Sequence, residues 1–321
     1  MSKSSRRECP DCGSQDRREF LAATGALLGV AALSGGVWGA PSRSSAAETA
    51  VGRLYESLTA EQRKVVVLPW DDERRTRINA NWHVTQADVQ SFTKDQQVLI
   101  TEIVKGVTSA DGYERFLKQM EDDDGGIGQY SVGIFGDPSG TPFEFALTGR
   151  HLTLRADGDT TPGAAFGGPI VYGHGAEGDP KQNLFWYQTK QVNEVFAMLD
   201  GKQRDKALVA SAPAESAVQL RQAGEALPGI SGRELSSDQK AVLRRSLEAV
   251  LAPYRKEDVA EAFEILEAGG GLDSLHVAFY RSGDLGNDQV WDVWRLESPT
   301  VVCHFRGAPH VHAYINVAKR S

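Results

Sequence analysis

The pattern of polar and apolar positions predicts several helices that begin at a paired signal. At four places a Ser, Thr or Asp is followed three residues later by Gln, the capping-box spacing in which each side chain satisfies a backbone donor of the first helical turn. The boxes Thr59/Gln62, Thr93/Gln96, Asp200/Gln203 and Ser236/Gln239 predict helices over about 60–68, 94–106, 201–211 and 237–251. Further helices are predicted near 109–120, 187–199 and 256–268. The boxes are unevenly spaced, which indicates a shared local device and not a solenoid repeat.

Apolar and β-branched runs predict strands in two blocks. The first block covers Tyr130–Phe135 and Phe143–Arg155, with a turn through residues 137–140. The second has three short turns, typical of an antiparallel meander, between the runs Leu275–Tyr280, Val290–Leu296, Val301–Phe305 and Val311–Val317. The order helices, strands, helices, strands favours an α+β fold with helices packed on antiparallel strand blocks. Between the blocks, six glycines in residues 163–178 indicate an ordered loop or flap, or else a plain flexible connection.

The N-terminal region has the pattern of an export leader. An uncharged, mildly apolar run from Phe20 to Ser42 follows the pair Arg17-Arg18, which is typical of a twin-arginine signal. We expect residues 1–47 to be removed after Ala47, or earlier after Gly39, and residues 48–321 to form a single α+β domain. The protein is then carried folded by the twin-arginine export machinery, is periplasmic or extracellular, and is free of the membrane after cleavage. An uncleaved membrane anchor is the alternative.

Charge and cysteine content narrow the class of protein. The chain has 35 basic and 43 acidic residues, and without residues 1–47 the counts become 29 and 39, a net charge of −10. An acidic exported protein is a poor partner for nucleic acid or for an anionic membrane surface. Cys303 is the single cysteine after position 47. An internal disulfide is therefore excluded, and the fold must depend on its core or on a bound metal.

Two histidines on the last predicted strand are the best candidates for metal chemistry. His310 and His312 flank Val311, and strand side chains two residues apart project from the same face. Tyr314 and Asn316 continue this polar row, whereas the alternate residues form an apolar row. A same-face pair of neutral imidazoles suits a divalent metal ion such as zinc, copper or iron. Two histidines on a half-wet polar face are the alternative interpretation.

A third ligand must come from elsewhere, because the glutamate that follows such a pair in cupins is missing here. His151 is the first candidate since it lies in the other strand block, and His174 in the glycine-rich segment is the second. Further candidates are His304, across the hairpin from the histidine pair, and the carboxylates Glu144 and Glu177. A site of two histidines and one carboxylate would use one of the last two.

Other polar residues are assigned no chemistry. His83 and His276 are predicted to be packing histidines, and Glu121–Asp124 lacks the spacing of a calcium loop and is interpreted as a solvated helix end. The chain has no Gly-x-Ser-x-Gly elbow and no Gly-Lys-Ser/Thr phosphate loop. A hydrolase that works without metal is therefore disfavoured.

Several segments together resemble the bacterial family known as domain of unknown function 3500. They are Phe135–Pro138 followed by Gly149–Leu154, then Phe279–Tyr280 through Trp294–Arg295 to Ser298–Thr300, and the closing His310–Ala313. Their order and rough spacing agree with the family over about residues 60–317. The resemblance implies no reaction, because that family has no assigned one.

The resemblance adds weight to a three-histidine metal site, because His151, His310 and His312 fall on matching histidines. Arg150 stands where the family has another histidine, Arg155 stands close to a usual asparagine, and His174 has no match. We therefore expect an exported metal-binding protein, a metalloenzyme acting on a small molecule, with His174 as a further candidate ligand. The alternative from another class is a non-catalytic periplasmic ligand-binding protein.

Overall fold

The structure is a computed structural model, and it describes residues 40–140, 142–175, 178–221, 224–285 and 288–319, all of which fall in one unit of the chain. Most of the predicted leader, residues 1–39, lies outside these ranges. Within them the strands form one 11-stranded sheet with the order β1-β2-β3-β4-β5-β11-β10-β9-β8-β6, and β7 pairs with β8 beside this path. The strands are β1 Val67–Leu68, β2 Ser131–Gly136, β3 Phe143–Gly149, β4 Leu152–Ala156, β5 Ile170–His174, β6 Leu208–Val209, β7 Ile230–Ser231, β8 His276–Tyr280, β9 Val293–Glu297, β10 Val301–Arg306 and β11 Val311–Val317.

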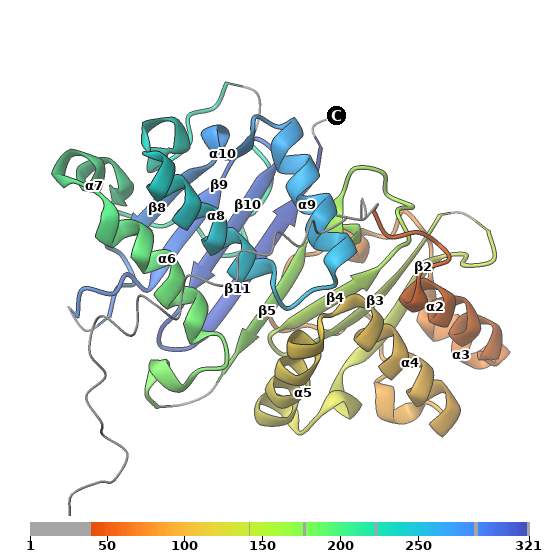
Figure 1. Cartoon of the computed structure of the whole chain (residues 1–321). Coiled ribbons are helices and arrows are strands. Elements are labelled where there is room, and N and C mark those ends of the chain that lie inside the picture. Colours follow the sequence, from red (N-terminus) through yellow and green to blue (C-terminus); the bar gives the residue numbers. More distant parts are fainter. Residues whose placement is uncertain (1–39, 141, 176–177, 222–223, 286–287, 320–321) are drawn as a thin grey trace, which may run out of the picture. The chain divides into compact units, whose positions relative to one another are not determined.

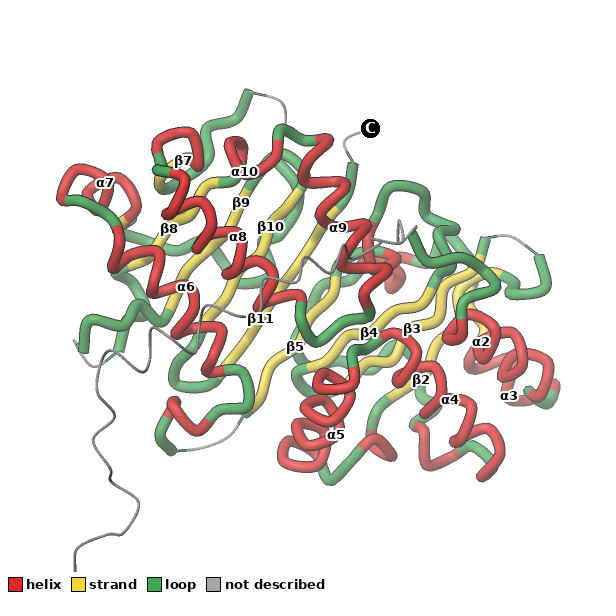
Figure 2. The backbone as a smooth tube through the Cα atoms, in the orientation of Figure 1, coloured by secondary structure: helices red, strands yellow, loops and turns green. Residues whose placement is uncertain are grey.

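Helices cover one face of this sheet (Figures 1 and 2). The helices are α2 Ala46–Ser57, α3 Ala60–Val66, α4 Lys94–Val107, α5 Ala110–Asp124, α6 Trp186–Met198, α7 Gly201–Ala207, α8 Ser237–Leu251, α9 Lys256–Ala268 and α10 Gly271–Ser274. Short 3-10 turns are η1 Glu73–Thr76, η2 Val89–Ser91, η3 Ile127–Gln129, η4 Ala165–Gly167, η5 Pro180–Gln182 and η6 Gly232–Glu234. Among the residues described, no helix is both long and apolar enough to cross a membrane.

The two faces of the sheet are covered by different parts of the chain. The alternate residues of β11 that were predicted to be apolar are buried in the main core beneath the helices, and they are Val311, Ala313, Ile315 and Val317. Tyr314 belongs instead to a smaller cluster with Val218 and Ala80, which come from two irregular segments, residues 69–88 and 210–229. The face that carries His312 is therefore covered by loops and not by helices.

The predicted α+β fold is confirmed, together with the four capping boxes and the antiparallel meander of β8, β9, β10 and β11. Two strand predictions were wrong in detail. The run Phe143–Arg155 is broken into β3 and β4 by a turn at Arg150-His151, and the glycine-rich segment supplies β5 in the middle of the sheet. β5 has the sequence Ile-Val-Tyr-Gly-His, a short apolar run whose strand signal is masked by the glycines on both sides. Gly173 itself lies where two backbones approach closely, because a Cβ there would be 2.3 Å from Val311 O.

The fold consists of two similar halves. From each edge of the sheet, a short strand is followed by the four strands of a meander in chain order, β1 to β5 from one edge and β6 with β8 to β11 from the other. In each half two helices precede a short strand (β1 or β6) that pairs in parallel with the first strand of an antiparallel meander. The halves meet where β5 pairs with β11 and where Thr108 bridges Tyr254 through reciprocal bonds, Ser109 N to Pro253 O at 3.0 Å and Arg255 N to Val107 O at 3.1 Å. This is an internal duplication and not a solenoid.

Candidate metal centre

His151 is presented at the tip of the tight turn between β3 and β4. Its backbone has φ +56°, a left-handed conformation that histidine tolerates better than most residues with a side chain. Tyr130 Oη and Gln119 Nε2 both donate to the carbonyl of Arg150, at 2.7 and 3.0 Å, and His151 N donates to Ala80 O at 2.6 Å. The turn is therefore fixed by bonds from three separate parts of the chain.

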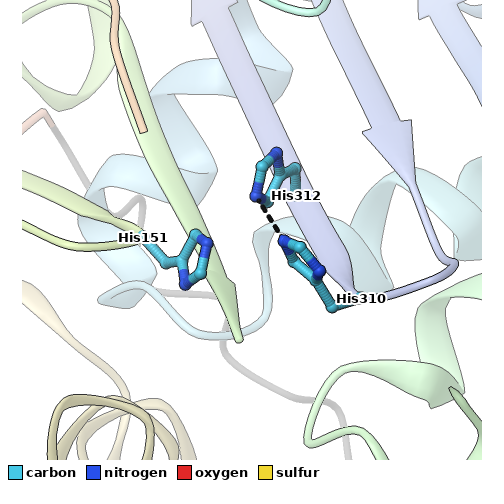
Figure 3. Close-up of side chains that lie close together, drawn as sticks. All are labelled: His151, His310 and His312. Atoms are coloured by element: carbon cyan, nitrogen blue, oxygen red, sulfur yellow. Dashed lines mark hydrogen bonds between the residues drawn. The ribbon is translucent and has the colours of Figure 1, made fainter. Parts of the chain in front are cut away.

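His310 and His312 come from the other half of the molecule, at the start of β11. Their side chains lie on the same face, as predicted, and the two Nε2 atoms are 3.0 Å apart. One ring nitrogen of each histidine and one of His151 all lie within 4.8 Å of one another. The three rings face a common space in Figure 3. These three histidines could hold a metal ion.

The spacing suits a tetrahedral ion after a small adjustment. Bonds of about 2.0–2.1 Å place two ligand nitrogens about 3.3 Å apart in tetrahedral geometry. The pair from β11 is already close to that value. His151 would have to approach the pair by a shift on the order of 1 Å, which a ring at the tip of a turn can make.

A buried carboxylate orients His151. Asp123, in the last turn of α5, lies 2.8 Å from His151 Nδ1 and accepts bonds from Gln119 Nε2 and Gly175 N, each at 2.8 Å. Burial alone would raise the pKa of Asp123, but the bonds from His151 and Gln119 outweigh it and the net shift is downward. An ionised Asp123 accepts a hydrogen bond from Nδ1–H of His151, and in the neutral tautomer that makes this bond the lone pair is on Nε2.

A second carboxylate orients His312 from the segment 210–229. Glu215 Oε2 lies 2.7 Å from His312 Nδ1. Burial raises the pKa of Glu215, but the bond from His312 and the charges of His312 and Arg306 lower it by more. Burial also lowers the pKa of His312, in spite of this bond. His312 is therefore neutral and donates from Nδ1, which leaves the lone pair on Nε2.

The arginine opposite His312 determines the state of His310. Arg306 pairs with His312 across β10 and β11, and its Nη2 lies 3.2 Å from His310 Nε2. A guanidinium only donates, so His310 Nε2 is an acceptor. Burial, helped by the charge of Arg306, lowers the pKa of His310 to about 4. The Nε2 atoms of His310 and His312 lie 3.0 Å apart, a spacing at which one cation could bind both nitrogens in place of the proton between them.

Other predicted candidates lie away from this group. His174, at the end of β5, contacts Asp122 Oδ2 at 3.0 Å, and it pairs with Val311, so its side chain is on the opposite face of the sheet from His312. His304 pairs with Tyr314, so the residue across the hairpin from the histidine pair is Arg306 and not His304. Glu144 is buried in an ion pair with Arg155 and Arg75, and Glu177 lies outside the described residues.

The prediction of packing histidines was wrong for His83. Its side chain is 44% exposed and its Nδ1 lies 3.2 Å from Asp88 Oδ1. His276 begins β8, where it pairs with Ser231 of β7. Neither belongs to the group of three histidines.

Three residues that complete this group, Asp123, Glu215 and Arg306, were assigned no role from the sequence. The interpretation of Glu121–Asp124 as a solvated helix end was wrong for Asp123, whose side chain is 2% exposed. The predicted helix 109–120 continues as α5 to Asp124 and ends at Gly125 with φ +76°, so the glycine pair Gly125-Gly126 was the available signal for the extra turn. Nothing near Glu215 indicates that its segment crosses to β11.

A family model described as "Protein of unknown function (DUF3500)" matches residues 41–317. The chain belongs to this family. The match confirms the resemblance found in the sequence and extends it to the start of α2. Neither the curated proteins nor the solved structures contain a match to this chain.

Proposed function

We propose that this protein is a metalloprotein in which His151, His310 and His312 bind one divalent ion, and that it acts as a metalloenzyme on a small molecule. One observation carries the proposal: the Nε2 atoms of His310 and His312 lie 3.0 Å apart, while Asp123 and Glu215 lie 2.8 and 2.7 Å from Nδ1 of His151 and His312. Carboxylates behind metal-binding histidines fix the tautomer and raise the basicity of the ligand nitrogen. All three histidines then offer Nε2.

Three protein ligands leave a coordination position open. Zinc, copper or iron held by these three histidines would supply a Lewis acid at that position, able to activate water or polarise a substrate. A closed structural site would instead have four protein ligands. Within the described residues the group has three, which favours a catalytic over a purely structural ion.

We further propose that the protein reaches the periplasm or the exterior through the twin-arginine export machinery. Support comes from Arg17-Arg18 and the uncharged run after it. This route transports folded proteins, so a metal could be bound before export. The acidic composition and the proposed loss of the leader favour a protein free of nucleic acid and of membrane.

Metal analysis of protein purified without an affinity tag tests the metal centre. Wild type is expected to contain about one ion per chain, and His310→Ala or His312→Ala should each reduce this to a small fraction. The melting temperature should also fall, because the ion binds the folded state only. Full metal retention in both variants would rule out the assignment and leave the non-catalytic binding protein as the better interpretation.

The third ligand is tested by a matched series of histidine variants. His151→Ala should release the metal like the β11 variants, whereas His83→Ala, at a half-exposed histidine, should keep it. His174→Ala should also keep it, since its ring contacts Asp122 on the other face. Metal loss in His174→Ala with retention in His151→Ala would transfer the third ligand to β5.

A further inference from the structure

We infer that Arg306 binds the anionic group of the substrate, so that the metal centre acts on a carboxylate or a comparable small oxyanion. This inference rests on the proposed function, because it places the anion at the open coordination position of the metal. Arg306 ends β10 next to the start of β11, and its side chain is 23% exposed. It is therefore within reach of a small molecule.

Arg306 lies at the edge of the histidine group. Its Nη2 is 3.2 Å from His310 Nε2 and 2.9 Å from His312 Nδ1, and its Nη1 is 3.2 Å from Glu215 Oε1. A group bound to an ion on these histidines would thus lie close to a guanidinium. Arg306 thus approaches two of the three rings with the same guanidinium.

The donors of Arg306 are not used up by the protein. Nη1 forms an ion pair with Glu215, but the buried Nε has no acceptor among the described residues. His312 Nδ1 donates its N–H to Glu215 and keeps the proton, so it has no lone pair with which to accept from Nη2. Only His310 Nε2 accepts from Nη2, and a bound ion would take that lone pair. Nε and Nη2 form the side-on fork that a carboxylate engages with two oxygens.

The charges around the group favour a monoanion. A divalent ion and Arg306 would contribute three positive charges, and the two carboxylates that contact the group, Asp123 and Glu215, contribute two negative ones. Asp122 is paired with Lys118, and burial lowers the pKa of His304 to about 3, so neither changes this balance. One positive charge remains for the ligand to neutralise, in a half-buried site where charges interact more strongly than in water.

Acetate titrated into the cobalt-loaded protein tests this inference. The mature protein is stripped with a chelator and reloaded with Co²⁺, whose visible bands report on its coordination. Acetate should shift the bands in wild type, and neutral acetamide should have a much weaker effect. In Arg306→Gln the Kd for acetate should rise about tenfold or more with cobalt content unchanged, the size expected for loss of a charge-assisted bond.

Two variants control this experiment. Arg150→Gln removes the same charge from an exposed arginine adjacent to His151 and should change the Kd for acetate by less than about twofold. Arg306→Lys keeps the charge without the planar fork and should give an intermediate Kd. Equal acetate affinity in wild type and Arg306→Gln would overturn the inference while leaving the metal centre intact. Loss of cobalt in Arg306→Gln would also overturn the inference, because Arg306 would then be needed to hold the metal ligands in place. Failure of the wild type to bind cobalt would refute the metal centre itself.

Discussion

At the scale of single residues, the ligands and the groups that orient them differ in how they are positioned. His310 and His312 are placed together by the two-residue period of one strand. The carboxylates that orient the histidines come from more distant parts of the chain. Glu215 is 97 residues from His312, and Asp123 is 28 residues from His151. Two histidines two residues apart are by themselves a weak indication of a metal site. The carboxylates strengthen it, because they fix which ring nitrogen is available to a ligand.

Glu215→Gln should weaken metal binding about 10–100-fold, because the neutral amide no longer supports the Nδ1 proton of His312. The affinity can be measured by competition with a chromophoric chelator. Glu225→Gln, an exposed position on the same segment that pairs with Arg221 at 3.7 Å, is the matched control and should leave the affinity unchanged. An unaltered affinity in Glu215→Gln would show that His312 needs no orienting carboxylate.

At the scale of elements, the capping boxes do more than begin helices. Gln62 of α3 donates to Gln96 of α4 at 2.9 Å, and Gln203 of α7 donates to Gln239 of α8 at 3.1 Å. The two halves thus repeat the same contact between helix starts. Each box is a local signal in the sequence, but its glutamine also joins two helices, and this explains why the boxes come in two pairs.

The helix α2 bears on the position of leader cleavage. It begins at Ala46, Ala47 is fully buried, and both oxygens of Glu48 bond to Arg255, at 2.7 and 2.9 Å. Cleavage after Ala47 would remove the start of the helix and place an ammonium group at its N-terminus, where positive charge is unfavourable. The packing therefore favours the earlier of the two predicted sites, after Gly39.

Mass spectrometry of the exported protein should accordingly find a chain that begins at Ala40. The segment 40–45 remains attached in that product, with Arg43 bonded to Pro138 O at 2.7 Å. A mass that corresponds to a chain beginning at Glu48 would contradict this expectation and would show that the first turn of α2 opens before cleavage.

At the scale of the whole molecule, a nearly symmetric sheet carries an asymmetric site. The histidines gather where the two halves join, with His151 on β3–β4 of one half and the other two on β11 of the other half. The corresponding turn of the second half, between β9 and β10, is Ser298-Pro299-Thr300 and contains no histidine. The three histidines that could hold a metal ion are therefore gathered at one end of the junction.

The proposed export concerns the whole chain and is tested at that scale. Replacing Arg17 and Arg18 together by lysine keeps the charge but removes the planar guanidinium forks. The precursor should then accumulate in the cytoplasm, folded and still carrying its metal, as cell fractionation would show. The matched control changes the other arginine pair, Arg6 and Arg7, to lysine and should export normally. Normal export of the Arg17/Arg18 variant would exclude the twin-arginine route.

The sequence by itself determined the features that depend on near neighbours. Capping boxes, the final meander and the two faces of β11 follow from interactions over a few residues, and all of them were predicted correctly. Other features depend on the tertiary structure alone. They are the place of β5 at the centre of the sheet and the parallel pairing of β1 with β2 and of β6 with β8. The positions of Asp123, Glu215 and Arg306 around the histidines belong to the same class. Such contacts join residues far apart in the chain, so they depend on how the two halves pack and leave no periodic trace in the local sequence.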